Sequence, residues 1–461
     1  MIDVQTPFSP GWWMDRLAKK LVGRQKRLKE LHDRFAGDPP LPVGAENMRD
    51  AYRAFQRKAR ANYAELIVEA TRERMLVAGF RTAAEHDENG DAKAREIWDA
   101  NSGAVLATDV HESMLALGDA YVIVGGPSDD LGGAPVITAE DPRQVVTIHD
   151  PVQQRKVRAG LKLFHDDELG RDYAYLYLPG SRYVASRETK RTARSSGGLR
   201  FSPSWDWDES LGGADGEGFP FDVVPVVRFR NRRGVGEFEP HIDLLDRINH
   251  QILQRMVIAT MQAFRQRAVK GDLPDTDETG QPIDYEKVFT ADPGGLWQLP
   301  AGVELWESGQ VELTGVLAAI KDDVRELSAV TRVPLPTMLP GDGTDSAEGA
   351  TFKREGLVFK VEDRITRATE GWKDVMSYAF LFANETERSQ RGAIDVLWVP
   401  PERRSLSERA QASSQAQDVP WHTRMSAIWG FRPEEIARME TERAADALLA
   451  PAPVVAPALT A

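Results

Sequence analysis

The sequence contains no cysteine in its 461 residues. Counting therefore excludes disulfide bonds, thiolate zinc sites and cysteine nucleophiles. Long apolar runs are absent as well, because none approaches the roughly 18 residues of a membrane span. The segment from Met1 to Pro7 lacks the basic and apolar regions of an export signal. These absences favour a protein that is assembled in the cytoplasm and makes no membrane contact.

Common catalytic motifs are also missing. The sequence has no GxxxxGK[ST], GxGxxG, GxSxG or HExxH run. Its eight histidines are scattered, and His111 has no second histidine four positions later, as a helical zinc site would need. We therefore expect no cofactor, no metal and no enzymatic activity.

One stretch partly matches a calcium loop. Positions one, three, five, six and twelve of an EF-hand loop correspond to Asp275, Asp277, Thr279, Gly280 and Glu286. Pro282 stands at the eighth position, which is usually hydrophobic, and Pro274 disfavours an entering helix. An acidic turn is the preferred interpretation, with a cation site as the alternative.

The consecutive residues Asp322 and Asp323 are interpreted as solvated acids on a helix.

The charge balance argues against tight binding of nucleic acid. Asp and Glu number 71 and Lys and Arg 58, for a formal charge of −13, whereas DNA affinity depends on basic residues that neutralise phosphates. A channel through which DNA passes is compatible with this charge, since it should repel phosphates weakly. The densest basic cluster, Arg228 to Arg233, is interpreted either as a nucleic-acid patch or as a source of salt bridges between subunits.

The first half of the chain divides into a helical part and a β-rich part. Helical periodicity covers residues 12–35, 46–75 and 92–117, with a stop at Gly118. From Tyr121 to Phe229, short β-rich runs recur and predict an antiparallel sheet. The second half begins with two long amphipathic helices, over 239–266 and 311–332, which flank an acidic excursion rich in Pro and Gly. Apolar side chains spaced by three and four predict the surface on which these helices pack: Leu245, Ile248, Ile252, Leu313, Leu317, Ile320 and Val324.

The order of these segments resembles the portal proteins of tailed bacteriophages, in the branch common in siphophages of actinobacteria. The resemblance rests chiefly on Val224 to Arg232 (VPVVRFRNR) followed by Gly236 to Asn249 (GEFEPHIDLLDRIN). Weaker matches include Leu117 to Val122 (LGDAYV), Gly294 to Trp297 (GGLW) and Pro400 to Ser405 (PPERRS). These runs describe a scaffold rather than a catalytic site, and their order along the chain is the persuasive feature.

This resemblance implies an α+β protomer that assembles as a ring. Its expected parts are a wing (1–238, helical and then an antiparallel β-sheet), a stem helix (239–266), a small α/β clip (267–310), a second stem helix (311–332), a tunnel loop (333–349), a long wing helix with a return strand (350–403), a helical crown (404–449) and a disordered tail (450–461).

The resemblance also implies residue roles. The clip residues would be Asp275, Asp277 and Trp297. Gly341 and Gly343 would be hinges of the tunnel loop. The side chains expected to face DNA in the tunnel are Asp342, Asp345, Glu348, Lys353 and Arg354.

The implied function is that of a channel at one capsid vertex of the virion, through which double-stranded DNA is packaged and ejected. The implied partners are further copies of the chain (probably 12 in the ring), the terminase large subunit, a head-tail connector or adaptor, and the major capsid and scaffolding proteins. Two alternatives stay open. One is a metal-dependent head-morphogenesis nuclease or protease using Asp275, Asp277 and Glu286, and the other is an oligomeric adaptor that is not a portal.

Overall fold

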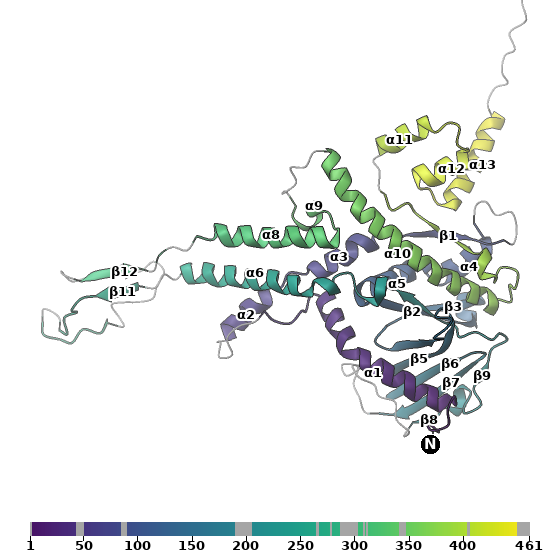
Figure 1. Ribbon diagram of the computed structural model, residues 1–461, viewed down its shortest axis with the longest axis horizontal. Helices are drawn as coiled ribbons and strands as arrows, with labels where there is room; N and C mark the ends of the chain where they lie inside the picture. The colour runs from purple at the N-terminus through teal and green to yellow at the C-terminus, as the bar shows by residue number, and fades with distance from the viewer. Residues whose placement is uncertain are drawn as a thin grey trace, which may run out of the picture.

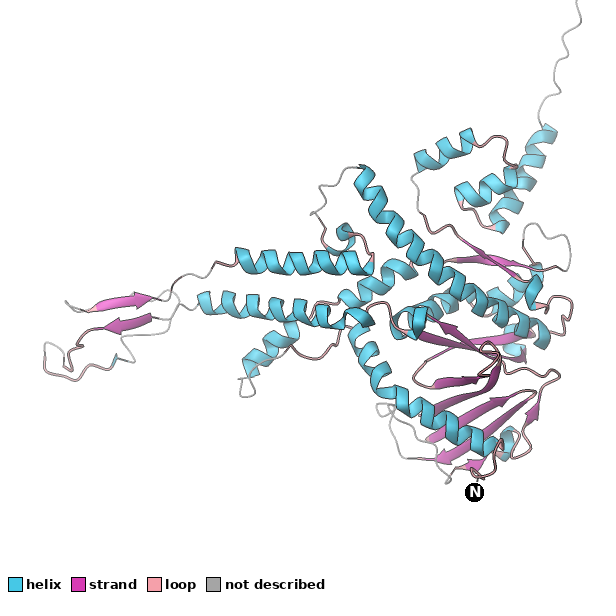
Figure 2. Ribbon diagram, in the orientation of Figure 1, coloured by secondary structure: helices cyan, strands magenta, loops and turns pink. Residues whose placement is uncertain are grey.

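The computed structural model describes residues 2–42, 50–83, 90–189, 205–263, 267–276, 279–285, 303–307, 309, 312–340, 347–402 and 406–449. Helices and strands build a broad body from which two long helices project side by side, with a small hairpin at their far end (Figure 1). Figure 2 shows that strands are concentrated in the body, apart from that hairpin and one strand pair near the C-terminal helices. The mixed α+β class predicted from the sequence is confirmed.

The N-terminal helix α1, Pro10–Phe35, begins where the Ser9 side chain accepts a hydrogen bond from the Trp12 amide at 3.2 Å. This is a standard helix cap, and proline suits the first turn. Its first half lies along the larger sheet, where Met14, Leu17 and Leu21 are buried. Its second half adds Leu28 and Leu31 to the main core. One helix thus joins two parts of the hydrophobic interior.

The other N-terminal helices are shorter than the sequence pattern indicated. They are α2 (Asp50–Lys58), α3 (Tyr63–Arg72), α4 (Ala92–Ala100) and α5 (Gly103–Leu117). The continuous helix expected over 46–75 is interrupted because Asn62 caps a new helix by accepting from the Glu65 amide. The helix expected over 92–117 is divided at Ser102, whose backbone is left-handed. Strand β1 (Val77–Arg81) was not expected from the helical pattern.

Two antiparallel sheets form the centre of the body. The larger sheet is a meander in the order β4-β5-β6-β7-β8, with β9 also paired to β7. The smaller has the order β10-β2-β3. The larger sheet's strands are β4 (Val145–His149), β5 (Val157–Asp166), β6 (Arg171–Leu178), β7 (Ser181–Glu188), β8 (Asp206–Trp207) and β9 (Glu217–Gly218); the smaller sheet's are β2 (Asp119–Ser128), β3 (Ala134–Glu140) and β10 (Val226–Arg230).

The longest helix, α10 (Ala347–Phe382), packs across the smaller sheet. Trp372 on this helix is fully buried, and its indole nitrogen donates a hydrogen bond to Nε2 of His111 at 2.9 Å. Gly371 allows the close approach, because a Cβ there would lie 2.4 Å from the Phe229 ring. A short helix, α9 (Leu335–Met338), precedes α10.

The C-terminal part returns to the body through strand β13 (Asp395–Trp398), which pairs antiparallel with β1. A helical group follows: α11 (Leu406–Gln415), α12 (Trp421–Arg424), the π-helical turn η7 (Met425–Trp429) and α13 (Pro433–Leu449). The tail expected to be disordered, 450–461, lies outside the described residues. Short 3₁₀ turns complete the chain: η1 (Asp129–Leu131), η3 (Glu209–Leu211), η4 (Arg232–Gly234), η5 (Glu239–His241) and η6 (Arg391–Ala393).

Candidate functional site

The projection consists of helices α6 (Ile242–Ala263) and α8 (Thr314–Thr331), which we call the stem (Figure 1). The two helices lie side by side and contact each other. Near the body the predicted packing residues Leu245, Ile248, Ile320 and Val324 are buried. These side chains join the main core, so the base of the stem is anchored in the body.

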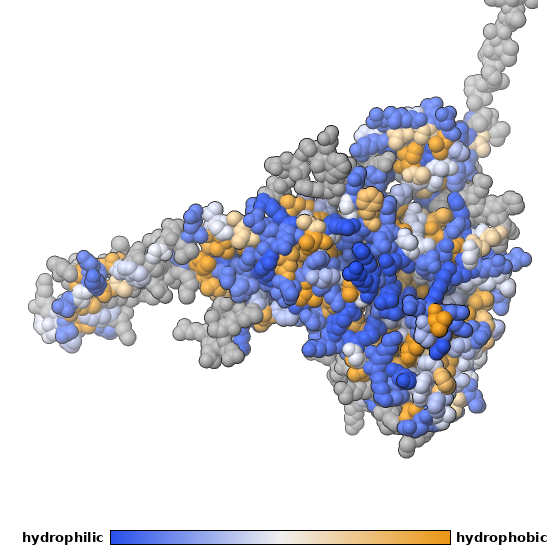
Figure 3. Space-filling model, viewed as in Figure 1, coloured by the Kyte–Doolittle hydropathy of each residue, from blue (hydrophilic) through white to orange (hydrophobic). Residues whose placement is uncertain are grey.

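Farther from the body, the predicted packing residues are less covered. Ile252 and Leu313 are only partly buried, and the Leu317 side chain is 41% exposed. Leu317 is therefore not a packing residue within one chain, in contrast to the expectation from its spacing. The space-filling view shows hydrophobic residues at the surface of the stem among hydrophilic ones (Figure 3). The described residues of one chain thus cover only part of the apolar face that the spacing predicts.

A charged contact crosses the stem on its outer surface. The Arg247 guanidinium donates to Asp323 at 2.8 Å and 3.0 Å and to Glu326 at 2.6 Å. Asp323, interpreted from the sequence as a solvated acid, is thus an ion-pair partner. Asp322 pairs with Arg325 on the same helix at 2.6 Å and is 70% exposed.

The hairpin at the tip of the stem pairs β11 (Arg267–Lys270) with β12 (Glu304–Glu307). Of the predicted clip residues, Asp275 is exposed beside a turn that the Thr276–Pro282 bridge closes. Asp277, Glu286 and Trp297 lie outside the described residues. Within the described parts of the chain, no group of three His, Cys, Asp or Glu residues could hold a metal ion.

The segment predicted as the tunnel loop, 333–349, is partly helical. Helix α9 occupies Leu335–Met338, and α10 begins at Ala347, so the last three residues of the predicted loop are helical. Glu348 and Lys353 belong to α10, and Arg354 is exposed on the same helix. Gly341, Asp342, Gly343 and Asp345 lie outside the described residues.

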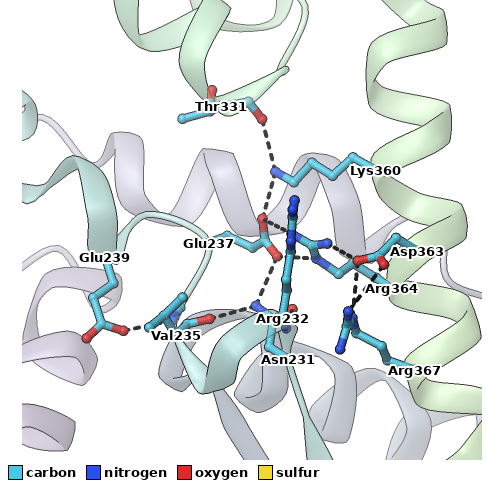
Figure 4. Close-up of polar contacts among 11 residues, drawn as sticks. Asn231, Arg232, Val235, Glu237, Glu239, Thr331, Lys360, Asp363, Arg364 and Arg367 are labelled. Carbon is cyan, nitrogen blue, oxygen red and sulfur yellow. Dashed lines mark hydrogen bonds and ion pairs between the residues drawn. The ribbon is translucent and has the colours of Figure 1, made fainter.

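The base of the stem contains a buried charged cluster centred on Glu237 (Figure 4). Glu237 lies between strand β10 and helix α6, and its side chain is only 4% exposed. It accepts from Arg364 at 2.6 Å and 3.2 Å and from the Asn231 amide at 3.0 Å, and it pairs with Lys360 at 3.0 Å. Lys360 also donates to the Thr331 carbonyl at 3.1 Å, at the C-terminal end of α8. A single carboxylate thus connects the entry to α6, the end of α8 and the long helix α10.

Opposing effects determine the pKa of Glu237. Burial alone raises it, but Lys360, Arg364 and Asn231 together outweigh burial and lower the pKa to about 2. For Lys360, burial lowers the pKa, and Glu237 opposes that shift. The ionised carboxylate is therefore the form that the cluster stabilises.

A second contact holds the same junction to α1. Glu239 accepts from Arg27 at 2.6 Å and also from the Gly236 amide at 2.8 Å. Gly236 has no space for a side chain, because a Cβ there would lie 2.3 Å from the Ala116 carbonyl oxygen. The junction is therefore fixed by hydrogen bonds on one side and by close backbone packing on the other.

The basic cluster Arg228 to Arg233 separates into two kinds of side chain. Arg228 pairs with the buried Asp119 at 2.7 Å, so it has a structural role within the chain. Arg232 and Arg233 are exposed and line a hollow of about 560 Å³ over the Glu237 cluster. The sequence drew attention to the cluster but could not separate these roles.

Sequence reasoning missed Glu237, Lys360 and Arg364 as a functional group. A signal was present, because Lys360 and Arg364 are four residues apart on the helix face that also carries the buried Val361 and Leu357. Basic residues beside a buried apolar stripe indicate a buried acidic partner. The charges of Glu237, Lys360 and Arg364 are paired with one another, and this arrangement suits a rigid mechanical joint.

Comparison with known protein sequences gives two results. No curated protein matches the sequence. The sequence model of the family described as "Phage portal protein, SPP1 Gp6-like" matches residues 19–447. None of the helices in the described ranges has the length and apolar character that a membrane span requires.

Solved structures similar to this chain include components of gene transfer agent (GTA) particles. A chain from the neck of a native GTA particle computed with C12 symmetry is 13% identical, with a TM-score of 0.42, over 87% of this chain and 98% of that chain. A chain from the neck of an empty GTA particle computed with C6 symmetry is 13% identical, with a TM-score of 0.44 and the same coverage. These scores are too low to support statements about this chain.

The family match covers nearly the whole chain, including the body, the stem and most of the C-terminal helices. It also removes the two alternatives, a head-morphogenesis enzyme and an adaptor that is not a portal. The chain therefore belongs to the SPP1 Gp6-like phage portal protein family, and it is a structural protein of the virion's portal vertex rather than an enzyme.

Proposed function

We propose that twelve copies of this chain form a ring around an axial channel, through which double-stranded DNA enters the capsid and later leaves it. A terminase would supply the motor, because the sequence has no phosphate-binding loop of its own. The terminase large subunit and then a head-tail connector would dock at the hairpin end of the stem. The major capsid and scaffolding proteins would surround the ring during assembly in the host cytoplasm.

The observation that supports this proposal most directly is the incompletely covered stem. Its two helices bury apolar side chains near the body but leave Leu317 exposed farther out. Repetition around a rotational axis would give such a face a partner, since each copy covers its neighbour. The body, by contrast, has a continuous core of its own.

The proposed ring gives each part of the protomer a role. Helices α6 and α8 would be the stem, and β11 with β12 would belong to the clip. The segment around 333–346 would be the tunnel loop, and the residues proposed to approach DNA are Asp342, Asp345, Glu348, Lys353 and Arg354. Helices α11 to α13 would form the crown.

A deletion of Gly341 to Ser346 tests the assignment of the tunnel loop. Particles assembled with this variant should contain rings but at least about tenfold less DNase-protected DNA, because the loop would no longer follow the duplex. Removal of residues 192–197, which lie between strands β7 and β8 in the sequence, serves as a control of equal length. Normal packaging by the first variant would refute the tunnel-loop assignment, while an absence of rings in the unmodified protein would refute the channel itself.

A further inference from the structure

The hollow over the Glu237 cluster has an excess of positive charge. Its lining includes six Arg or Lys side chains and two carboxylates, Glu237 and Asp363. Lys360 and Arg364 form ion pairs with Glu237, and Asp363 accepts hydrogen bonds from Arg364 and Arg367. Arg232, Arg233 and Arg332 remain, and among the described residues their side chains have neither a hydrogen bond nor an ion pair. The carboxylates that the structure describes in one chain therefore leave these three guanidinium groups unmatched.

Two ionisable groups of the hollow have lowered pKa values. The pKa of Lys360 is lowered first by burial and further by Arg364 and Arg332. The pKa of His241, on the same hollow, is lowered by burial and then by Lys360. Burial is the larger cause of both shifts, and nearby positive charge acts in the same direction.

Two of the three arginines also have an unusual backbone. Arg233 and Arg332 both have φ of 59°, in the left-handed region that residues other than glycine rarely adopt. Arg332 ends α8 in this conformation, and Arg233 lies inside the η4 turn. The backbone thus directs two unpaired side chains to one surface at a local energetic cost.

Exposed apolar side chains border the same hollow. Phe359 is 62% exposed and Val330 is 49% exposed, and both line it. Arginine and exposed aromatic side chains are enriched together at protein interfaces, where the apolar side chains become buried. A surface that contacts only sliding DNA has no use for an exposed Phe, which the duplex backbone would leave in water.

We propose that this hollow, lined by Arg232, Arg233, Arg332, Val330 and Phe359, is the face on which an adjacent copy of the chain docks an acidic surface. A second copy has the required chemistry, because the chain carries 71 acidic against 58 basic residues. The contact would be heterologous, as a closed ring requires, with this face of one copy meeting a different face of the next. The inference rests on the proposed ring and adds the residues that join its neighbours.

The first test measures whether Phe359 is covered on assembly. The chain has no cysteine, so Phe359→Cys places a single thiol in the hollow. Its reaction with a maleimide should be at least about tenfold slower in the oligomer than in dissociated protein. Val105→Cys is the matched control, because Val105 is 63% exposed on α5, does not line the hollow and should react equally in both states. Equal rates for Phe359→Cys in the two states would overturn the proposal.

The second test reverses the charge of the arginines. The double variant Arg232→Glu/Arg332→Glu should keep its thermal midpoint, since neither side chain has an ion-pair partner among the described residues, but should lose oligomer by mass photometry. Arg438→Glu, at a residue that is 72% exposed on α13, is the control and should assemble normally. Rings that persist in the double variant would refute this interface while leaving the proposed channel intact. Intact rings with lost DNA transit would assign the arginines to DNA instead, and unmodified protein without rings would refute both proposals.

Discussion

Arg364 donates two hydrogen bonds to Glu237, from Nε to Oε1 at 2.6 Å and from Nη2 to Oε2 at 3.2 Å. Both residues are buried, and 127 positions separate them in the sequence. The pair joins the long helix of the body to the start of the stem. Because Lys360 adds a link from the same carboxylate to the end of α8, the orientation of both stem helices depends on one acidic side chain.

Replacing Glu237 with glutamine should strongly destabilise the chain. The substitution preserves shape but leaves the buried Lys360 charge without its Glu237 partner and leaves Arg364 paired only with Asp363. Breaking a buried ion pair in this way typically costs about 3–5 kcal/mol. Chemical denaturation at fixed protein concentration, followed by tryptophan fluorescence, measures the change. Arg247→Ala is the control, because it removes an ion pair on the exposed outer surface of the stem and should have a much smaller effect. Equal losses in the two variants would contradict the central role of Glu237.

His111 should make stability depend on pH. Burial lowers the pKa of His111 from 6.5 to about 3, so the folded chain binds fewer protons than the unfolded chain between these values. The stability that depends on neutral His111 should therefore be complete above pH 6.5. As the pH decreases below that value, the free energy of unfolding should fall by up to about 1.4 kcal/mol per pH unit. His111→Gln, which retains an acceptor for Trp372, should show a shallower decline between about pH 7 and about pH 5.5. Parallel curves would rule out this source of the dependence.

Gly236→Ala should weaken the junction between strand β10 and the stem. The added Cβ would lie 2.3 Å from the Ala116 carbonyl oxygen, so the backbone of one segment must move. Overpacking of this kind costs about 1–3 kcal/mol. Gly315→Ala is a suitable control, because no heavy atom lies within 4 Å of the corresponding Cβ. Thermal unfolding of both variants is the measurement, and an unchanged midpoint for Gly236→Ala would contradict the packing described.

The sequence predicted elements where local periodicity was strong. The stem helices follow from repeated apolar spacing, and the end of α5 follows from Gly118, whose φ is 87°. Strand β1 was missed because its partner β13 lies more than 300 residues away, and that pairing leaves no local pattern. Long-range contacts of this kind are set by the tertiary fold.

The candidate site was predicted less completely than the fold. The run from Gly236 to Asn249 marked the correct junction, yet the role of Glu237 depends on Lys360 and Arg364, which only the fold brings together. Spacing placed Leu317 on the packing face without indicating whether its own chain or another copy covers it. A pattern on one helix cannot identify the partner of that helix.

The central claim, a ring with an axial channel, is tested most directly by negative-stain electron microscopy of the purified full-length chain together with a mass measurement of the particle. The account predicts rings of about a dozen subunits with an axial opening of roughly 20 Å or more, wide enough for a DNA duplex. A closed assembly with no opening of that width, or a chain that stays monomeric with its capsid and scaffolding partners present, would contradict it.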